Sequence, residues 1–479
     1  MTYVEHELAD IMRDGFDTQT VPQLEPVTSG MLADALAAHE PPDDGDDGDD
    51  GLTIEDRVFT ATHTLATIRQ AAHARLVTPW AVLGATLARI VAEVPPHVVL
   101  PPLVGSDASL NLAVALVADS GGGKSGASGC AADAVTILGR RAHDIGPGSG
   151  EGIMQEFLEY DDQEKCNVLR ANPLALLQAD EIGQIGAVQG RSSQASFGPI
   201  IRSMLTGDMV ATSAVDAARK RHLPANTYRL AVVAGVQPRL ASILLDDTDA
   251  GTPQRWVWMP ASDPEWDVPD TPWPAPVRWS LPIPPRGGTA DGRVRIEVPD
   301  ATVRAVKQAR VRKLRGEGEA LDGHRLLARE KVAAALAILH GGYTITEQWW
   351  HLAGQVMAVS DVTRDRCLTA LGDSAAKAAK ARGRLDAERE AGAREARDEQ
   401  LSRYAALIWR TVATKGHSNA KHEPDAGCTT RCLSFALRNH KGADREAAVA
   451  LAAQLEWIEE REGHWFPGCS QPNELGGAA

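Results

Sequence analysis

The chain has 479 residues, of which 43% are hydrophobic and six are cysteines. This length exceeds what one ordinary core needs and predicts two or three domains. Six unpatterned cysteines fit a reducing cytoplasm better than a disulfide framework. No uncharged apolar run approaches the length of a membrane-spanning helix, and Met1–Asp17 lacks the basic-then-apolar order of a signal peptide. We therefore expect a cytoplasmic protein that makes no membrane contact.

The net charge of −15 is concentrated near one end of the chain. Residues 1–57 carry 16 acidic and two basic residues, which leaves a balance of −1 over residues 58–479. Within that segment, residues 43–51 alternate aspartate pairs with glycine, which predicts a disordered linker. An acidic tail on a nearly neutral body neither excludes nor supports binding to nucleic acid.

Helical patterns come first along the chain, and strands follow. Residues 31–36 are amphipathic and predict a short helical arm, and the Ala/Leu-rich stretch 54–92 predicts helices that divide at Pro79. From residue 108, short apolar runs alternate with helical patterns, which indicates a parallel α/β sheet covered on both faces. The expected strands are 110–117, 173–179, 229–236 and 255–259.

These patterns predict an α/β fold: a P-loop NTPase core with a parallel sheet, flanking helical regions and a small winged-helix-like domain at the C-terminal end. The expected parts are an acidic arm and linker (1–57), a helical region (58–107), the core (108–300), a helical domain with a long charged helix (301–400) and the winged-helix-like domain (401–479).

The loop after the first strand carries the strongest motif. Residues 118–125 read Ala-Asp-Ser-Gly-Gly-Gly-Lys-Ser, which matches the phosphate-binding Walker A pattern with alanine in its first position. Glycines let backbone N–H groups turn toward phosphate oxygens, and the next helix presents its positive N-terminal end. Lys124 would reach the β- and γ-phosphates of ATP, and Ser125 would ligate Mg²⁺. A glycine-rich turn with a chance Lys-Ser pair is the alternative. The expected nucleotide-binding residues are Gly121, Gly122, Gly123, Lys124, Ser125 and Gly126.

An acidic pair ends the second expected strand, 56 residues beyond Lys124. Asp180 would hold Mg²⁺ through water, and Glu181 would orient and deprotonate the attacking water. Two acids after a strand are also common as the start of a helix. Following a phosphate loop, the catalytic interpretation is favoured.

Two further side chains are candidates for sensing or stabilising the γ-phosphate. Gln237 ends the third strand, where it either contacts phosphate or lies in a solvated loop. Arg255 follows an acidic loop and would act in trans on the nucleotide of a neighbouring subunit. Arg239 is its main competitor, and either arginine could instead form a structural ion pair.

The phosphate loop and the runs 79–83, 100–105, 109–112, 148–152, 235–238 and 251–255 form one set of matching segments. Together they resemble the actinobacterial phage and mobile-element proteins called primase-helicase-like ATPases. The resemblance covers residues 58–370 and is most specific around the phosphate loop, although Asp119 stands where a small residue or proline is commoner. It implies an ATP-driven motor that acts on DNA in replication and assembles as a ring. No primase module is evident before residue 58.

In ring helicases related to this class, a hairpin between the second and third strands lines the central channel. Here residues 208–228 occupy that position and contain Arg219, Lys220, Arg221 and His222. Four basic or titratable residues suit contacts to the phosphate backbone of single-stranded DNA. A second basic stretch lies in 300–331, and a solvated helix face explains either stretch equally well.

The C-terminal segment offers two weaker signals. His417, His422, Cys428 and Cys432 are four ligand types that zinc accepts, but their spacing is not that of a standard finger. The alternative is a loop followed by a helix that begins near Thr429. The order of helices and a hairpin at 459–465 is typical of a winged helix.

The leading hypothesis is a P-loop ATPase that couples hydrolysis to unwinding or translocation of DNA during replication of a phage or mobile element. One alternative is a nucleotide-switched loader that binds replication partner proteins. Another is a degenerate P-loop protein with a structural role. Stimulation of turnover by DNA separates the first from the second, and nucleotide binding without turnover indicates the third.

Overall fold

The computed structural model divides the chain into two compact units, Met1–Ser374 and Ala375–Ala479. Helix α13 (Glu347–Lys415) belongs to both units. The residues that the structure describes are 28–39, 52–184, 197–213, 219–245, 251–264, 266–285, 291–317, 325–415, 427–440 and 444–472.

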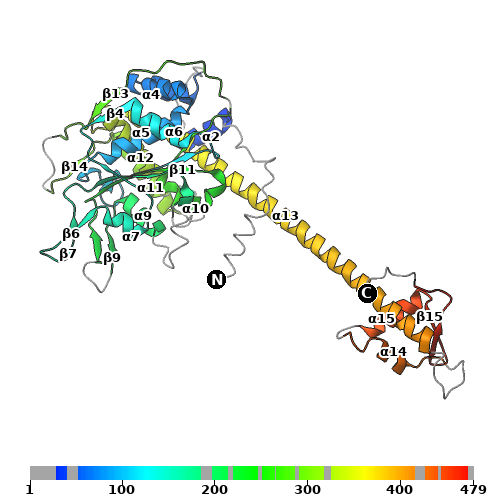
Figure 1. Ribbon diagram of the computed structural model, residues 1–479. Coiled ribbons are helices and arrows are strands. Elements are labelled where there is room, and N and C mark those ends of the chain that lie inside the picture. The colour runs from blue at the N-terminus through cyan, green and yellow to red at the C-terminus, as the bar shows by residue number, and fades with distance from the viewer. Residues whose placement is uncertain are drawn as a thin grey trace. The chain divides into compact units, whose positions relative to one another are not determined.

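A five-stranded parallel sheet forms the centre of the first unit (Figure 1). Because every neighbouring pair of strands is parallel, the chain must cross back over a face of the sheet between them, and helices supply most of these connections. The expected α/β fold class is therefore confirmed at the level of the sheet. In spatial order the strands are β12 (Trp256–Pro260), β3 (Leu112–Val117), β11 (Arg229–Val236), β8 (Leu174–Ala179) and β5 (His143–Ile145).

Alternate side chains of each strand enter two separate cores. On β3, Leu112, Val114 and Leu116 point to one face, whereas Ala113 and Val117 point to the other. Because both cores are apolar, the strands are buried on both sides, and their sequences read as continuous apolar runs. The helices over the first face include α4 (His63–Ala74), α5 (Pro79–Ala92), α6 (Lys124–Ala134) and α12 (Arg325–Leu339); those over the second are α7 (Gly150–Gln155), α9 (Phe197–Thr206) and α10 (Ser242–Leu245).

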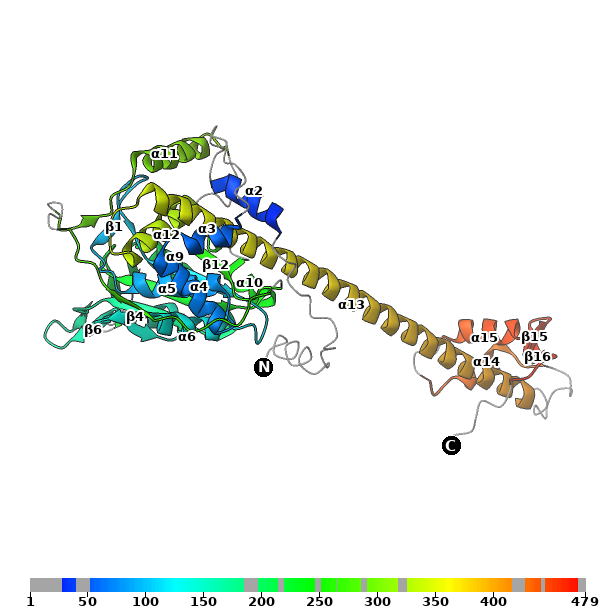
Figure 2. The same ribbon diagram turned by 90° about the horizontal axis from the view of Figure 1, so that it is seen from above.

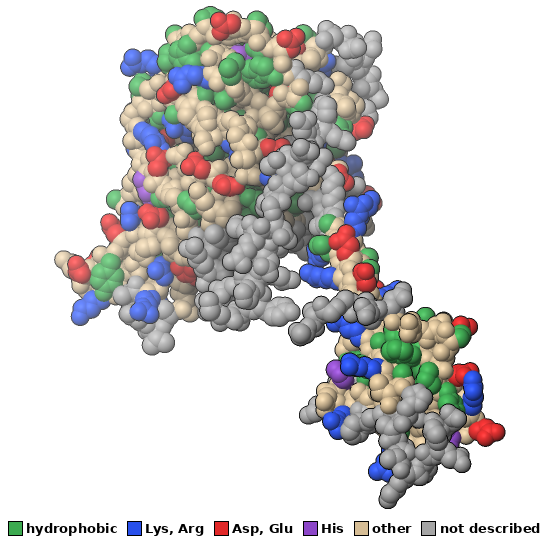
Figure 3. Space-filling view, turned by 45° about the vertical axis from the view of Figure 1, so that its right-hand side comes forward, with side chains coloured by type: hydrophobic (Ala, Val, Ile, Leu, Met, Phe, Trp, Pro, Cys, Tyr) green, Lys and Arg blue, Asp and Glu red, His purple; other side chains and the backbone are tan. Residues whose placement is uncertain are grey.

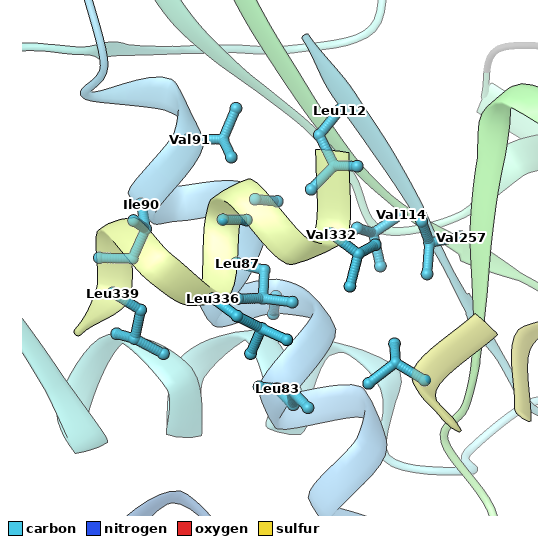
Figure 4. Packing of buried hydrophobic residues seen from close by; sticks show 14 of the residues in the cluster. Leu83, Leu87, Ile90, Val91, Leu112, Val114, Val257, Val332, Leu336 and Leu339 are labelled. Carbon is cyan, nitrogen blue, oxygen red and sulfur yellow. The ribbon is translucent and has the colours of Figure 1, made fainter. Parts of the chain in front are cut away.

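Helix α5 is the best-buried helix against the first face. Thr78 caps it by accepting a hydrogen bond from the Ala81 amide, and Pro79 occupies the first turn, where a missing N–H costs nothing. Every residue of α5 except Arg89 is buried. Figure 4 shows its leucines packing against α12 and the adjoining strands, which anchors the sheet from one side.

A second set of short elements lies at the edge where the sheet strands begin. Two antiparallel hairpins lie side by side there and project from the unit (Figure 1), and the Asn167 amide donates to the Lys220 carbonyl between them at 2.9 Å. The elements are β6 (Leu158–Asp161) with β7 (Cys166–Leu169), β9 (Val210–Thr212) with β10 (Arg221–Leu223), and a small sheet of β14 (Val294–Arg295), β1 (Val98–Leu100) and β2 (Ala108–Ser109).

Arg229 fixes this edge from inside. It opens β11, is fully buried, and burial lowers the pKa of its guanidinium to about 9. All three of its nitrogens donate hydrogen bonds, so the buried cation is compensated by acceptors from three segments of the chain. These acceptors are the carbonyls of Val94, Pro95 and Val98, the Ser109 hydroxyl and the Asn111 side-chain oxygen.

The expected N-terminal arm forms helix α2 (Ser29–His39). Its last residue, His39, is buried, and its Nε2 lies 2.9 Å from Asp361 Oδ2 on α13. Asp361 also accepts from Arg325 at 2.7 Å and from Arg364 at 2.8 Å. Burial lowers the pKa of His39, although Asp361 opposes that shift. The arm is thus held by a buried polar network.

The remaining helices and strands of the first unit lie around this framework. Among the described residues, no helix combines the length and apolar character needed to cross a bilayer. The elements are α3 (Ile54–Thr60), β13 (Val277–Ser280), which pairs with β4 (Val135–Leu138), and α11 (Asp300–Leu314), with short 3₁₀ turns at Pro238–Leu240 and Pro253–Arg255.

The second unit is a small helical module closed by a hairpin. The C-terminal part of α13 packs Ile408 and Val412 against the module's other helices and Ile458. Asp444 caps the last helix by accepting from the Ala447 amide. The elements are α14 (Thr430–Ala436), α15 (Arg445–Gln454), β15 (Ile458–Arg461) and β16 (His464–Pro467), with an isolated bridge between Cys428 and Trp465.

Candidate functional site

The glycine-rich loop joins β3 to α6, as the sequence predicts. Gly121 and Gly123 have φ of 78° and 81°, a left-handed conformation that other residues adopt only with strain. Gly122 is required for a different reason, since a Cβ there would lie 2.6 Å from the Ala118 Cβ. All three glycines are therefore needed for this tight loop.

Helix α6 begins at the loop with Lys124. Its first turn contains no acidic residue, and Ser125 and Gly126 are exposed beside it. The unpaired amides of a first turn and the helix dipole attract anions. This end of α6 therefore offers backbone donors, a hydroxyl and a cation at one place.

The Lys124 ammonium folds back onto its own loop. Its Nζ donates to the Ala118 carbonyl at 2.8 Å and to the Asp119 carbonyl at 2.7 Å. Burial lowers the pKa of Lys124, and the negative charges of Glu181 and Asp119 oppose that shift. Lys124 is thus close enough to interact electrostatically with the Glu181 carboxylate, although the two residues are 57 positions apart in the chain.

Asp180 and Glu181 directly follow β8, and β11 lies between β8 and β3. Gly235, near the end of β11, fits tightly between the acidic pair and the glycine-rich loop. A Cβ at this position would collide with the Asp180 carbonyl oxygen and lie 3.4 Å from Lys124 Cδ. The Gln237 side-chain amide donates a hydrogen bond to Glu181 Oε1. The structure therefore brings Lys124, the acidic pair and Gln237 together at one edge of the sheet.

The edge where these residues meet is where a ligand site is expected. In open α/β sheets, ligands bind beyond the carboxyl ends of the strands where the connections change direction. After β3 the chain forms the outermost strand, β5, on one side of the sheet and then returns through β8 and β11. It next forms β12, on the other side of β3. The glycine-rich loop lies at that change of direction.

Arg255 is not part of this cluster. It precedes β12, whose first residue, Trp256, is level with Ala113 near the start of β3, so Arg255 lies at the opposite edge of the sheet. Its Nη1 donates to the Gly251 carbonyl at 2.7 Å. Arg239 is exposed and lies two positions beyond Gln237, so it is nearer in the chain to the cluster.

The basic run 219–222 lies on the β9–β10 hairpin, also at the edge opposite the glycine-rich loop. Arg219, Lys220 and His222 are exposed. Arg221 is half-buried, and its Nε donates to Gln155 Oε1 at 3.0 Å. Three of the four side chains therefore lie at the surface of the hairpin, and Arg221 ties it to Gln155.

The C-terminal zinc candidates are only partly visible. His417 and His422 lie outside the described residues. Cys428 is buried, and Cys432 is half-buried on α14. Among the described residues, no three His, Cys, Asp or Glu side chains gather as a metal site would require. The helix expected near Thr429 forms, because α14 begins at Thr430.

Sequence reasoning did not single out Gly235 as a contact between the two motifs. A glycine within an otherwise apolar strand signals a close approach of another chain segment, and Gly235 stands in such a run. It also did not foresee that Val77, before α5, supports the glycine-rich loop. A Cβ on Gly126 would lie 3.4 Å from the Val77 side chain, so α6 begins directly beside it.

Comparison with known proteins adds no further information about this site. No model of a protein family matches the chain, and no curated protein matches it.

Proposed function

We propose that this chain is a P-loop ATPase that acts as a motor on DNA during replication of a phage or mobile element. One observation carries the ATPase proposal. Lys124, the acidic pair 180–181 and Gln237 come from three neighbouring strands and meet beyond their carboxyl ends. Such a combination of cation, carboxylates and amide beside a glycine-rich loop suits transfer of a phosphoryl group.

The residues present fit ATP and Mg²⁺. The loop glycines and the first turn of α6 supply N–H donors for phosphate oxygens, and Ser125 and Asp180 supply the oxygen ligands that Mg²⁺ prefers. When bound, Mg²⁺ would neutralise charge on the β- and γ-phosphates. Lys124 would exchange its two loop carbonyls for phosphate oxygens.

Glu181 is the candidate base. A carboxylate at this edge can orient a water molecule and accept its proton, provided that the carboxylate is held in place. The hydrogen bond from Gln237 holds one of its oxygens. Gln237 therefore links the base on β8 to the strand beside the glycine-rich loop.

The proposed DNA contacts lie at the other edge of the sheet, on the exposed side chains of the β9–β10 hairpin. Strand β11 begins just after this hairpin and ends just before Gln237, so one strand connects the proposed DNA contacts to the proposed nucleotide site. Arg255 is at the DNA-binding edge too, so it could reach only a nucleotide bound to another copy. That geometry suits the homo-oligomeric ring that the sequence resemblance implies.

The C-terminal unit favours a second candidate, a nucleotide-switched loader of replication proteins. Its element order of helix, bridge, two helices and hairpin is compatible with the expected winged helix and supports this candidate. A DNA-reading helix needs exposed polar side chains, but α15 exposes only Arg445, Glu446, Ala450 and Gln454. Contact with a protein partner therefore suits this helix better than base reading.

Steady-state ATP hydrolysis by the wild type and by Glu181→Gln, each with and without single-stranded DNA, tests the proposal. We expect DNA to stimulate the wild type severalfold and the variant to be inactive. Turnover that DNA does not change would favour the loader. An active Glu181→Gln variant would contradict the site itself.

A further inference from the structure

Helix α11 carries an exposed cationic surface that the proposed site does not use. From residue 301 to 316 the chain contains six arginines and lysines and no acidic residue. All six side chains are exposed, and within the described part of the chain none forms an ion pair. The six are Arg304, Lys307, Arg310, Arg312, Lys313 and Arg315.

Only the first half of α11 is anchored to the protein. Thr302 and Val306 are buried, with Val306 in the core beneath the sheet's first face. From Val311 to Arg315 every residue is exposed, and the helix lies at the periphery of the unit (Figure 2). Val311 and Leu314 are 45% and 69% exposed among the cations. An apolar pair on a basic, solvent-facing helix has no role in the core.

A groove of about 2330 Å³ joins α11 to the basic hairpin. Arg310, Arg312 and Lys313 line it together with residues 206–208, which precede β9, and 225–226, which follow β10. Three of the six cations of α11 and the base of the β9–β10 hairpin therefore line one groove.

Two buried carboxylates of this groove, Asp361 and Asp107, are already paired with cations of other segments. Asp361 is paired with arginines and His39, and Asp107 accepts from Arg293 at 2.6 Å and from Arg295 at 2.7 Å. Exposed carboxylates on the groove are Asp34, Asp208, Glu317, Glu347, Asp365 and Asp373. A polyanion would therefore follow α11 itself and not the middle of the groove.

We propose that α11 binds the backbone of single-stranded nucleic acid, as a second contact continuous with the hairpin. Residues 304–315 of a helix span about 16 Å, which is long enough to contact more than one phosphate of a strand. The exposed Val311 and Leu314 suit the unstacked bases of a single strand, which a duplex keeps inside. The proposal takes nucleic acid as the partner from the proposed function, but it does not depend on ATP hydrolysis.

Charged side chains elsewhere on the first unit argue for a local contact. On the face shown in Figure 3, acidic and basic side chains are interspersed, so no broad field of one sign would draw nucleic acid there. A variant of α11 should thus change binding far more than an equal loss of charge at another exposed position.

The test is binding of a fluorescent oligothymidine, without nucleotide, over a series of salt concentrations. The variant Arg310→Gln/Arg312→Gln/Lys313→Gln keeps helix propensity and removes three charges. The matched control is Lys380→Gln/Arg382→Gln/Arg384→Gln, on an exposed part of α13. Each phosphate contact to a single strand contributes about 0.7 to the slope of log affinity against log salt. We expect the α11 variant to bind at least about tenfold more weakly with a slope lower by about 2, and the control to match the wild type.

Equal affinity and slope for the wild type and the α11 variant would overturn the inference, and so would an equal loss in the control. Wild type that binds no oligothymidine would also overturn it. Because this assay contains no ATP, failure of the proposed hydrolysis would appear separately, as lost turnover with intact binding. The variant Val311→Ser/Leu314→Ser should weaken binding of a duplex of the same length less than it weakens binding of the single strand. A larger loss of affinity for the duplex would contradict the contact with bases.

Discussion

The Gln237 side chain donates a hydrogen bond to the carboxylate of Glu181. The two residues end adjacent parallel strands and are 56 positions apart. Gln237 is therefore a positioning residue for the proposed base. We expect Gln237→Ala to lower kcat by about 10- to 100-fold with little change in KM for ATP, since the carboxylate is present but poorly oriented. Gln184→Ala, at an exposed position beyond Glu181, is the control. A change confined to KM would mean that Gln237 contacts the nucleotide and not the base.

Lys124 is expected to be indispensable for turnover. Its ammonium would neutralise charge on the transferred phosphoryl group, so Lys124→Ala should lower hydrolysis by at least about 100-fold. Steady-state phosphate release measures this, with the exposed Lys380→Ala as control. Undiminished turnover in Lys124→Ala would show that hydrolysis occurs elsewhere.

Arg229 is expected to stabilise the fold without affecting chemistry. Arg229→Met would leave buried carbonyl and hydroxyl acceptors from β1, β2 and the segment after α5 without their donor. We expect the free energy of unfolding to fall by roughly 3–5 kcal/mol. Urea denaturation of the first unit checks this, with the exposed Arg278→Met as control. A variant as stable as the wild type would mean that water replaces the guanidinium.

Acidification should weaken the docking of α2. Burial keeps the pKa of His39 below its ordinary value of about 6.5, with Asp361 opposing and Arg325 and Arg329 adding to the shift. Above about pH 6.5 the histidine is neutral in both the folded and the unfolded state. Below that pH the unfolded state binds a proton but the folded state does not, so the free energy of unfolding falls as the pH drops toward the folded-state pKa. His39→Gln stays neutral throughout and should lose less stability than the wild type when the pH falls from 7.5 to 5.5, with the difference arising below about pH 6.5. Parallel urea curves that change equally in both proteins would exclude His39 as the cause.

Local patterns predict the long strands and the candidate motifs, but not their arrangement. Strands β3, β8, β11 and β12 are predominantly apolar runs, so their sequences identify them. Strand β5 has only three residues, His143–Ile145, two of them polar, so no apolar run signals it. Order within the sheet depends on packing between distant segments, and this order decides that Gln237 meets Glu181.

Burial of charged residues was also beyond prediction. Arg229 looks like the ordinary polar start of an apolar strand, yet it is fully buried. Lys331 belongs to the basic stretch for which the sequence allows either a solvated face or a DNA contact. Its ammonium instead donates to the Asn111 and Leu205 carbonyls inside the fold, each at 2.7 Å. Only the tertiary structure separates these buried cations from the exposed ones on α11.

Arg255 provides the sharpest test of the proposed ring. It lies at the edge of the sheet opposite Lys124, so within one chain it cannot reach a nucleotide held by the glycine-rich loop. We expect Arg255→Ala and Lys124→Ala each to be inactive alone. Mixed together, they should recover part of the activity, because a Lys124→Ala subunit supplies Arg255 to the intact loop of an Arg255→Ala neighbour. Arg239→Ala is the control. No recovery, with a lowered free energy of unfolding in Arg255→Ala, would mean that its bonds to Thr206 and Gly251 are purely structural.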